Sequence, residues 1–172
     1  MARTPEKAKG LSVKIYHGDY NDQNSLEKSL SSIDTLLLIS DMDDSAKHIE
    51  QHRDVIKATQ NSGVKKIVYT SIQGAEDNTC FSSVVQSNRQ TEKDIADSGL
   101  DWVIGHNGIY IEPDVEYIET YKKLGAIFNC AEDGKCGYTT RSELVYAYAR
   151  MLICDKHNSQ IYNLHGKTIT QY

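Results

Sequence analysis

Two basic residues near the start of the chain have side chains suited to phosphate binding. Arg3 and Lys7 are four residues apart. A guanidinium can form two parallel hydrogen bonds with phosphate oxygens, whereas a lysine ammonium contributes a compact point charge. The pattern predicts a small anion site at residues 3–7. The alternative is that both side chains are solvated charges at a frayed terminus.

Two other polar patterns indicate no metal site. His48 and His52 have metal-binding helical spacing, but Glu50 is one position away from the glutamate of a metalloprotease motif. We therefore expect a solvated or half-buried helix face. The acidic residues 41–44 lack the glycine and terminal glutamate of a calcium loop, and are expected to begin a helix, whose dipole favours carboxylates there.

A third pattern combines an amide with a phenol. Asn107 and Gly108 follow a short apolar run, and Tyr110 comes two residues later. Because asparagine and glycine both tolerate positive φ, the residues alone favour a turn over a functional role. None of the eleven tyrosines is followed four residues later by lysine, so the acid–base pair of ordinary short-chain dehydrogenases is missing.

Three short apolar runs would position these residues: 34–39, 66–70 and 101–105. Continuous apolar runs of this length are typical of strands buried on both faces. Helical patterns separate them, one over residues 45–62 and one that ends before Ser98. Alternation of strand and helix predicts an α/β fold with a mainly parallel sheet and right-handed crossovers.

Flanking segments extend this pattern at both ends. Residues 13–16 alternate as a short strand, and residues 22–30 can form a helix. Thr140 and Glu143 have the spacing of a capping box. The helix behind them would place Leu144, Ala147, Tyr148, Met151 and Leu152 on one face, and residues 159–164 read as a late strand.

Composition excludes several classes of function. The chain has 172 residues, 39% hydrophobic and 25% charged, with a net charge of −5. It therefore lacks the basic footprint of a nucleic-acid-binding protein. No apolar run approaches the length of a membrane span and no export signal is evident, so we expect no membrane partner and a cytoplasmic location. The four cysteines are expected to stay reduced.

Ten segments, taken in order and spacing, resemble the NmrA-like atypical short-chain dehydrogenase/reductase family. Among its members the chain is most similar to bacterial type 2 NAD(P)H:quinone oxidoreductases and triphenylmethane-dye-reducing relatives. The likeness runs from residue 3 to residue 166. Its segments are residues 3–8, 18–22, 36–40, 51–56, 63–71, 91–93, 98–100, 107–110, 132–135 and 139–141.

The resemblance implies a Rossmann-like three-layer sandwich that binds NAD(P)H. It implies NADP rather than NAD, since an arginine at the position of Arg3 faces the 2′-phosphate in that family. Asn107 and Tyr110 would border the nicotinamide and act as the catalytic residues that orient it. The implied cofactor-binding residues are Arg3, Lys7, Asp19, Tyr20, Ile39, Ser40, Thr70, Ser71, Asn107, Gly108 and Tyr110.

The chain departs from the family at its ends and at two internal positions. No Gly-x-Gly-x-x-Gly loop occurs, and relatives continue past Tyr172. We therefore expect one domain over residues 1–172, incomplete at both ends and truncated at the first βαβ unit. His106 replaces the family's usual arginine, and Asn88 replaces a frequent histidine.

Truncation of the sheet would expose an edge of residues 35–39. Such an edge invites pairing with another strand. We expect either that residues 13–16 pair directly with it or that a partner copy completes the sheet as a homo-oligomer.

The leading functional hypothesis is an NAD(P)H-dependent oxidoreductase. It would pass a hydride to a small-molecule acceptor, a quinone or a similar flat, electron-poor compound. Whether the chain is an enzyme stays open, because the missing glycine loop also fits two alternatives. These are a non-catalytic nucleotide-sensing module and a fragment that cannot bind cofactor.

Overall fold

The computed structural model describes residues 1–41, 43–127 and 134–170. Cys130 and the motif residues Glu132 and Asp133 lie outside the described residues, as does Met42 of the acidic run.

A parallel four-stranded sheet forms the centre of the molecule, in the order β1-β2-β3-β7. Its strands are β1 (Thr35–Ile39), β2 (Lys66–Ile72), β3 (Asp101–Asn107) and β7 (Gln160–Leu164). In register, Ile39 pairs with Thr70, and Ile72 pairs with Asn107, so the strands end together at one edge. The predicted α/β fold with a mainly parallel sheet is confirmed.

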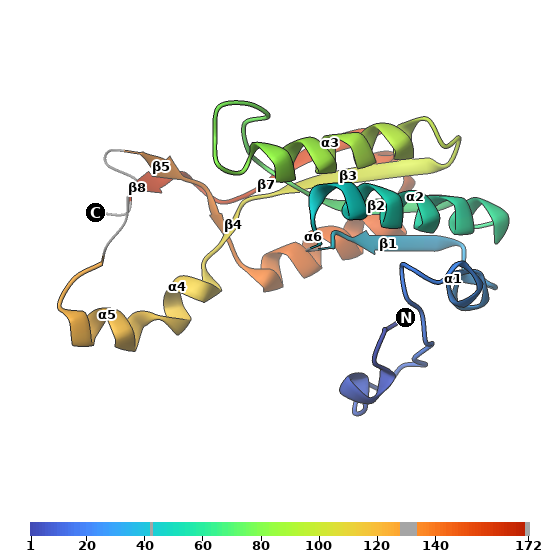
Figure 1. Cartoon of the computed structure of the whole chain (residues 1–172), viewed down its shortest axis with the longest axis horizontal. Helices are drawn as coiled ribbons and strands as arrows, with labels where there is room; N and C mark the ends of the chain where they lie inside the picture. Colours follow the sequence, from blue (N-terminus) through green and yellow to red (C-terminus); the bar gives the residue numbers. More distant parts are fainter. Residues whose placement is uncertain (42, 128–133, 171–172) are drawn as a thin grey trace.

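Helices cover both faces of this sheet and make it a three-layer sandwich (Figure 1). One face carries α1 (Gln23–Leu30), α2 (Ser45–Asn61) and α3 (Ser82–Ala96), and the other carries α6 (Arg141–Ile153). The larger core lies under α1–α3 and includes Leu26, Leu38 and Val55, all 0–1% exposed. Val68, Val103, Leu144 and Met151 form the smaller core under α6.

Local sequence signals account for the ends of these helices. Asp22 and Asp44 accept hydrogen bonds from backbone N–H groups as the N-caps of α1 and α2, and Asp44 does so as expected from the acidic run at residues 41–44. Thr140 and Glu143 form the predicted capping box of α6. Gly63, at φ +73°, follows the last turn of α2 in the left-handed conformation that glycine favours.

Shorter elements lie beyond the carboxyl ends of the strands. There α4 (Glu112–Glu116) and α5 (Ile118–Leu124) extend away from the sandwich (Figure 1). Two small ladders join β4 (Ile109–Tyr110) to β6 (Tyr138–Thr139) and β5 (Lys135–Cys136) to β8 (Ile169–Thr170). The 3₁₀ turns are η1 (Pro5–Ala8) and η2 (Asp155–His157).

The predicted strand at residues 13–16 is wrong. These residues adopt no strand, and the only pairing nearby is an isolated parallel bridge between Ala2 and His17. The expected pairing of residues 13–16 with β1 is therefore also wrong. Within the described part of the chain, β1 has a single ladder neighbour, β2.

Candidate functional site

The predicted site residues gather at the carboxyl edge of the sheet. Ligands of open parallel sheets bind outside this edge, where the loops diverge. Ser40 directly follows β1, Thr70 and Ser71 lie near the end of β2, and Asn107 ends β3. The sheet register thus brings together residues that are up to about 70 positions apart in sequence.

Five of the predicted residues line one cavity of about 500 Å³ beside β1. They are Arg3, Asp19, Tyr20, Ile39 and Ser40. The cavity extends along the edge of β1 to Leu36 and Leu37. One wall is therefore formed by β1 residues, and the remaining lining comes from residues 1–3, residues 18–21, Asp41 and Gln51 of α2.

Hydrogen bonds fix the two ionisable residues of this loop. The Tyr20 hydroxyl donates to the Ile39 carbonyl over 3.1 Å. Burial, aided by the charge of Asp41, raises the pKa of Tyr20 to about 12, so the phenol stays neutral. The Asp19 carboxylate accepts from the Asn21 backbone N–H and side-chain amide, both over 2.9 Å, which lowers its pKa. The loop therefore presents a fixed negative charge beside a neutral phenol.

Lys7 lies in a neighbouring basic cavity of about 470 Å³. The turn η1 places it there, and Arg3 borders both cavities. Lys9 lines this second cavity as well. Three cationic residues, Arg3, Lys7 and Lys9, therefore line this cavity, which adjoins the first one at Arg3.

Thr70 and Ser71 face opposite sides of the sheet and lie outside both cavities. The Thr70 hydroxyl accepts from the Ser40 backbone N–H over 2.9 Å and so ties the end of β1 to β2. Ser71 is fully buried and donates to Glu92 on α3. The Ser71 hydroxyl hydrogen is therefore bound within the protein, and the Thr70 oxygen is held by Ser40.

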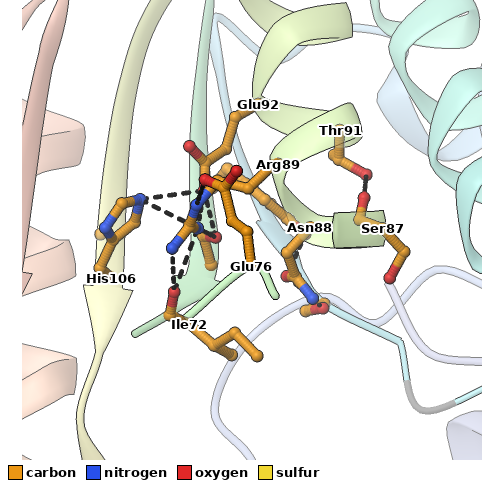
Figure 2. A network of polar contacts seen from close by, with 12 residues as sticks. Ile72, Glu76, Ser87, Asn88, Arg89, Thr91, Glu92 and His106 are labelled. Carbon is orange, nitrogen blue, oxygen red and sulfur yellow. Dashed lines mark hydrogen bonds and ion pairs between the residues drawn. The ribbon is translucent and has the colours of Figure 1, made fainter. Parts of the chain in front are cut away.

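A partly buried charge network connects α3 with β3, and Figure 2 shows its residues Glu92, Arg89 and His106 side by side. Glu92 Oε1 lies 2.6 Å from Arg89 Nη1 and 2.9 Å from His106 Nε2. Burial raises the pKa of Glu92, but the His106 and Ser71 hydrogen bonds and the nearby charges outweigh it and hold the pKa below its ordinary value. Arg89 also donates to the Ile72 carbonyl. The network therefore anchors the loop that leaves β2.

The two histidines of α2 are buried, so the expected solvated or half-buried face is wrong. His48 is 2% exposed and His52 0%, with ring centroids 4.0 Å apart. His48 Nε2 lies 3.0 Å from the Ser40 hydroxyl, and His52 Nδ1 lies 3.1 Å from the Thr91 hydroxyl. Among the described residues, no group of three or more His, Cys, Asp or Glu side chains is arranged to hold a metal ion.

Asn107 and Tyr110 contact each other at the β3 end of the same edge. The Asn107 side-chain amide donates to the Tyr110 hydroxyl over 3.1 Å. Gly108 does not adopt positive φ, so the turn interpretation of the Asn-Gly pair is wrong. Instead, a Cβ at Gly108 would lie 2.4 Å from the Gly137 carbonyl, which makes glycine necessary for close approach of the two segments.

Sequence reasoning missed several polar residues at this edge. Tyr148 was expected only as an apolar-face residue of α6, yet its hydroxyl contacts Asn107 over 2.6 Å. Glu92, Arg89 and the buried Gln51, which lines the first cavity, were not singled out. The one available signal was Gly105 within a predicted strand, since such a glycine often marks a close approach.

Comparison with protein families identifies a nucleotide-binding family. The NAD(P)H-binding family profile matches residues 1–124. Quinone oxidoreductase 2 of Escherichia coli (strain K12) is 33% identical over 99% of this chain and 61% of its own length. An NmrA-like family domain-containing oxidoreductase of Aspergillus flavus, flvB, is 32% identical over 92% of this chain and 53% of its own length.

Solved structures of similar sequence also match. Citrobacter sp. triphenylmethane reductase complexed with NADP(H) superimposes with a TM-score of 0.89, at 33% identity over 98% of this chain and 60% of that one. The NADPH complex of the E. coli quinone oxidoreductase QOR2 gives a TM-score of 0.88 at 32% identity, with the same coverage. The chain thus spans about three fifths of the length of these proteins. Within its described residues, no helix is long and apolar enough to cross a membrane.

Proposed function

This chain belongs to the NAD(P)H-binding, NmrA-like family, and from that membership we propose that it is an NAD(P)H-dependent oxidoreductase. Its acceptor in this proposal is a quinone or a similarly flat, electron-poor compound. The observation that carries the proposal is the convergence of Arg3, Asp19, Tyr20 and Ser40 on one cavity at the carboxyl edge of the sheet. Asn107 and Tyr110 complete the same edge.

The donor set of this edge fits a dinucleotide. Two adjoining cavities of about 500 and 470 Å³ differ in character, because one has the Asp19 and Tyr20 loop and the other has Arg3, Lys7 and Lys9. The first suits a base and ribose, and the second suits a phosphate. Asn107 and Tyr110 would orient the nicotinamide. When bound, the dinucleotide supplies a hydride, while the protein binds and orients it.

We propose NADP(H) rather than NAD(H) as the preferred cofactor. The 2′-phosphate distinguishes the two, and Arg3 is the side chain placed between both cavities. A guanidinium binds a phosphate through two hydrogen bonds. The NADP(H) complexes of the two similar reductases support this preference.

The proposed activity is tested by following NADPH oxidation with purified protein and duroquinone. This quinone carries a methyl group at each of its four non-carbonyl ring carbons, so it has no unsubstituted position to which the free thiol of exposed Cys80 could add. Oxidation that saturates in both NADPH and duroquinone supports an oxidoreductase. Saturable NADPH binding without oxidation would instead identify a nucleotide-sensing module, and no binding would identify a fragment that cannot hold the cofactor.

We make three further proposals, which concern domain organisation, self-association and cellular compartment. We propose that residues 1–172 all belong to one Rossmann-like NAD(P)-binding domain, and that copies form homo-oligomers through β1, whose Ile39 is 60% exposed. We also propose the cytoplasm as its compartment, which the free thiols of Cys80, Cys136 and Cys154 support.

A further inference from the structure

Tyr148 reaches from α6 to the backbone of β3. Its side chain is 4% exposed, and its hydroxyl lies 2.6 Å from Asn107 Oδ1 and 3.2 Å from the Gly105 carbonyl oxygen. Both partners belong to the strand that ends at the candidate nicotinamide site. A phenol in the small core under α6 therefore contacts a predicted catalytic residue directly.

Gly105 provides the space for this phenol. A Cβ at position 105 would lie 2.3 Å from the Tyr148 hydroxyl oxygen and 2.8 Å from its Cζ. The backbone at Gly105 has no positive φ that would itself demand glycine. Glycine at position 105 therefore allows the Tyr148 ring of α6 to approach the backbone of β3 closely.

The distances fix the direction of the hydrogen bonds. Burial raises the pKa of Tyr148, so its hydroxyl stays protonated, and the Gly105 carbonyl can only accept. A separation of 2.6 Å is typical of O–H···O, and the 3.1 Å between Asn107 Nδ2 and the Tyr110 oxygen is typical of N–H···O. Tyr148 therefore donates to Asn107 Oδ1, and Asn107 donates through Nδ2 to Tyr110.

This arrangement leaves the Tyr110 hydrogen available. The Tyr110 oxygen already accepts from Asn107, and within the described part of the chain no acceptor takes its own hydrogen. The side chain is 37% exposed at the carboxyl edge of the sheet. A donor that is held by one neighbour and open to solvent on its other side can reach a bound ligand.

We propose that Tyr110 donates a hydrogen bond to the carbonyl oxygen of the electron acceptor, and that Tyr148 is the positioning residue that orients Asn107 for this purpose. The inference rests on the proposed function. Reduction of a quinone to a hydroquinone takes a hydride, with its two electrons, and one further proton from solvent. Negative charge develops on the carbonyl oxygen, and a donor held in place stabilises it there.

The positioning step can be tested without cofactor. In ¹H–¹⁵N spectra of the whole chain, Asn107→Asp identifies the Asn107 side-chain amide by loss of its signals. We expect Tyr148→Phe and Tyr110→Phe each to shift these signals. Tyr146→Phe is the matched control, since Tyr146 lies on the same helix and is 71% exposed. Unchanged Asn107 signals in folded Tyr148→Phe protein would overturn the positioning role.

The donor step is read from the carbonyl stretch of duroquinone bound in the presence of NADP⁺, which allows no reduction. We expect a band shifted to lower frequency in the wild type, and loss of that shift in Tyr110→Phe. The same shift in both proteins would overturn the donor role, as would absence of duroquinone binding.

Turnover separates this inference from the proposed function. With NADPH and duroquinone, we expect kcat to fall about a hundredfold in Tyr110→Phe and about tenfold in Tyr148→Phe. A wild type that binds duroquinone with the shifted band but oxidises no NADPH would contradict the proposed function alone. Full turnover by Tyr110→Phe would contradict the donor role alone.

Discussion

Burial decides the protonation of His52, a core residue of α2. His52 is fully buried between α2 and β2, with Tyr69 packed edge-on against its ring. Burial, with a smaller effect from neighbouring His48, lowers its pKa to about 3. The imidazole is therefore neutral over the whole physiological range, and it acts as a hydrogen-bonding core residue.

The first prediction concerns the acid stability of the protein. In the unfolded chain His52 has an ordinary pKa near 6.5, and in the folded protein about 3. Between these two pKa values His52 is protonated in the unfolded chain and neutral in the folded protein. The stability that the neutral, buried imidazole contributes is therefore complete above about pH 6.5 and is lost as pH falls. We expect His52→Asn to reduce the slope of unfolding free energy against pH, between pH 6 and 4, by about 1.4 kcal/mol per pH unit.

Chemical denaturation at a series of pH values measures this slope. The exposed His165 provides the control variant, His165→Asn. Equal slopes for wild type and His52→Asn would contradict a neutral buried imidazole.

The second prediction concerns Arg3 and the choice of cofactor. If its guanidinium binds the 2′-phosphate, Arg3→Gln should weaken NADPH binding by roughly tens of fold. This is the loss of affinity expected when one charged hydrogen-bonding group is removed. NADH has no such phosphate, so its affinity should stay the same. Isothermal calorimetry with both cofactors measures the difference.

The control for Arg3→Gln is Lys28→Gln, which removes one positive charge from the exposed face of α1, outside both cavities. An equal loss of NADPH and NADH affinity in Arg3→Gln would show that Arg3 does not bind the 2′-phosphate.

At the scale of elements, local signals predicted most of the sandwich. The three apolar runs became β1, β2 and β3, and the helical pattern at residues 45–62 became α2. These elements could be predicted because strands buried on both faces have continuous apolar runs, and helices buried along one stripe have apolar residues at helical spacing. The alternating run at residues 13–16 failed, because alternation alone supplies no hydrogen-bonding partner. There Val13 is 66% exposed and Lys14 lies over the Tyr16 ring instead.

The site was predicted less completely than the fold. Position along the sequence placed Ser40, Thr70 and Asn107 at strand ends, but could not say which face each side chain takes. Ser71 faces α3 and binds Glu92, whereas Asn107 faces α6 and binds Tyr148. Such contacts join residues 21 and 41 positions apart. They depend on packing between layers, which periodicity does not encode.

The third prediction tests the match between β3 and α6. Gly105→Ala should destabilise the protein by about 1–3 kcal/mol, because the new methyl group overlaps the Tyr148 hydroxyl. Part of this cost should disappear in the Tyr148→Phe background, where that oxygen is absent. A thermodynamic cycle of the four proteins, measured by urea denaturation, gives the coupling energy. Additive effects would contradict the contact.

At the scale of the whole molecule, the site is divided among three strand ends. The β1 end borders the first cavity, the β2 end supplies the hydrogen bond that connects it to β1, and the β3 end carries Asn107 and Tyr110. Because this edge is set by the register of the whole sheet, the site depends on the integrity of all three strands.

The fourth prediction concerns self-association through β1. Strand edges pair readily unless a charge or a covering element opposes them. If copies associate through this edge, Thr35→Lys should shift the protein toward monomer in light scattering after size exclusion. Thr35 is the exposed first residue of β1, and Ser31→Lys, just before the strand, is the control. A wild type that is monomeric at high concentration would contradict the proposed oligomer.

A titration of ¹⁵N-labelled protein with NADPH tests the central claim most directly. The account predicts saturable shifts of the backbone signals of Asp19, Ser40 and Asn107, which lie at the carboxyl edge of the sheet. The signal of Lys66, at the opposite end of β2, should stay unchanged. Absence of shifts at millimolar NADPH, or shifts confined to residues away from this edge, would contradict it.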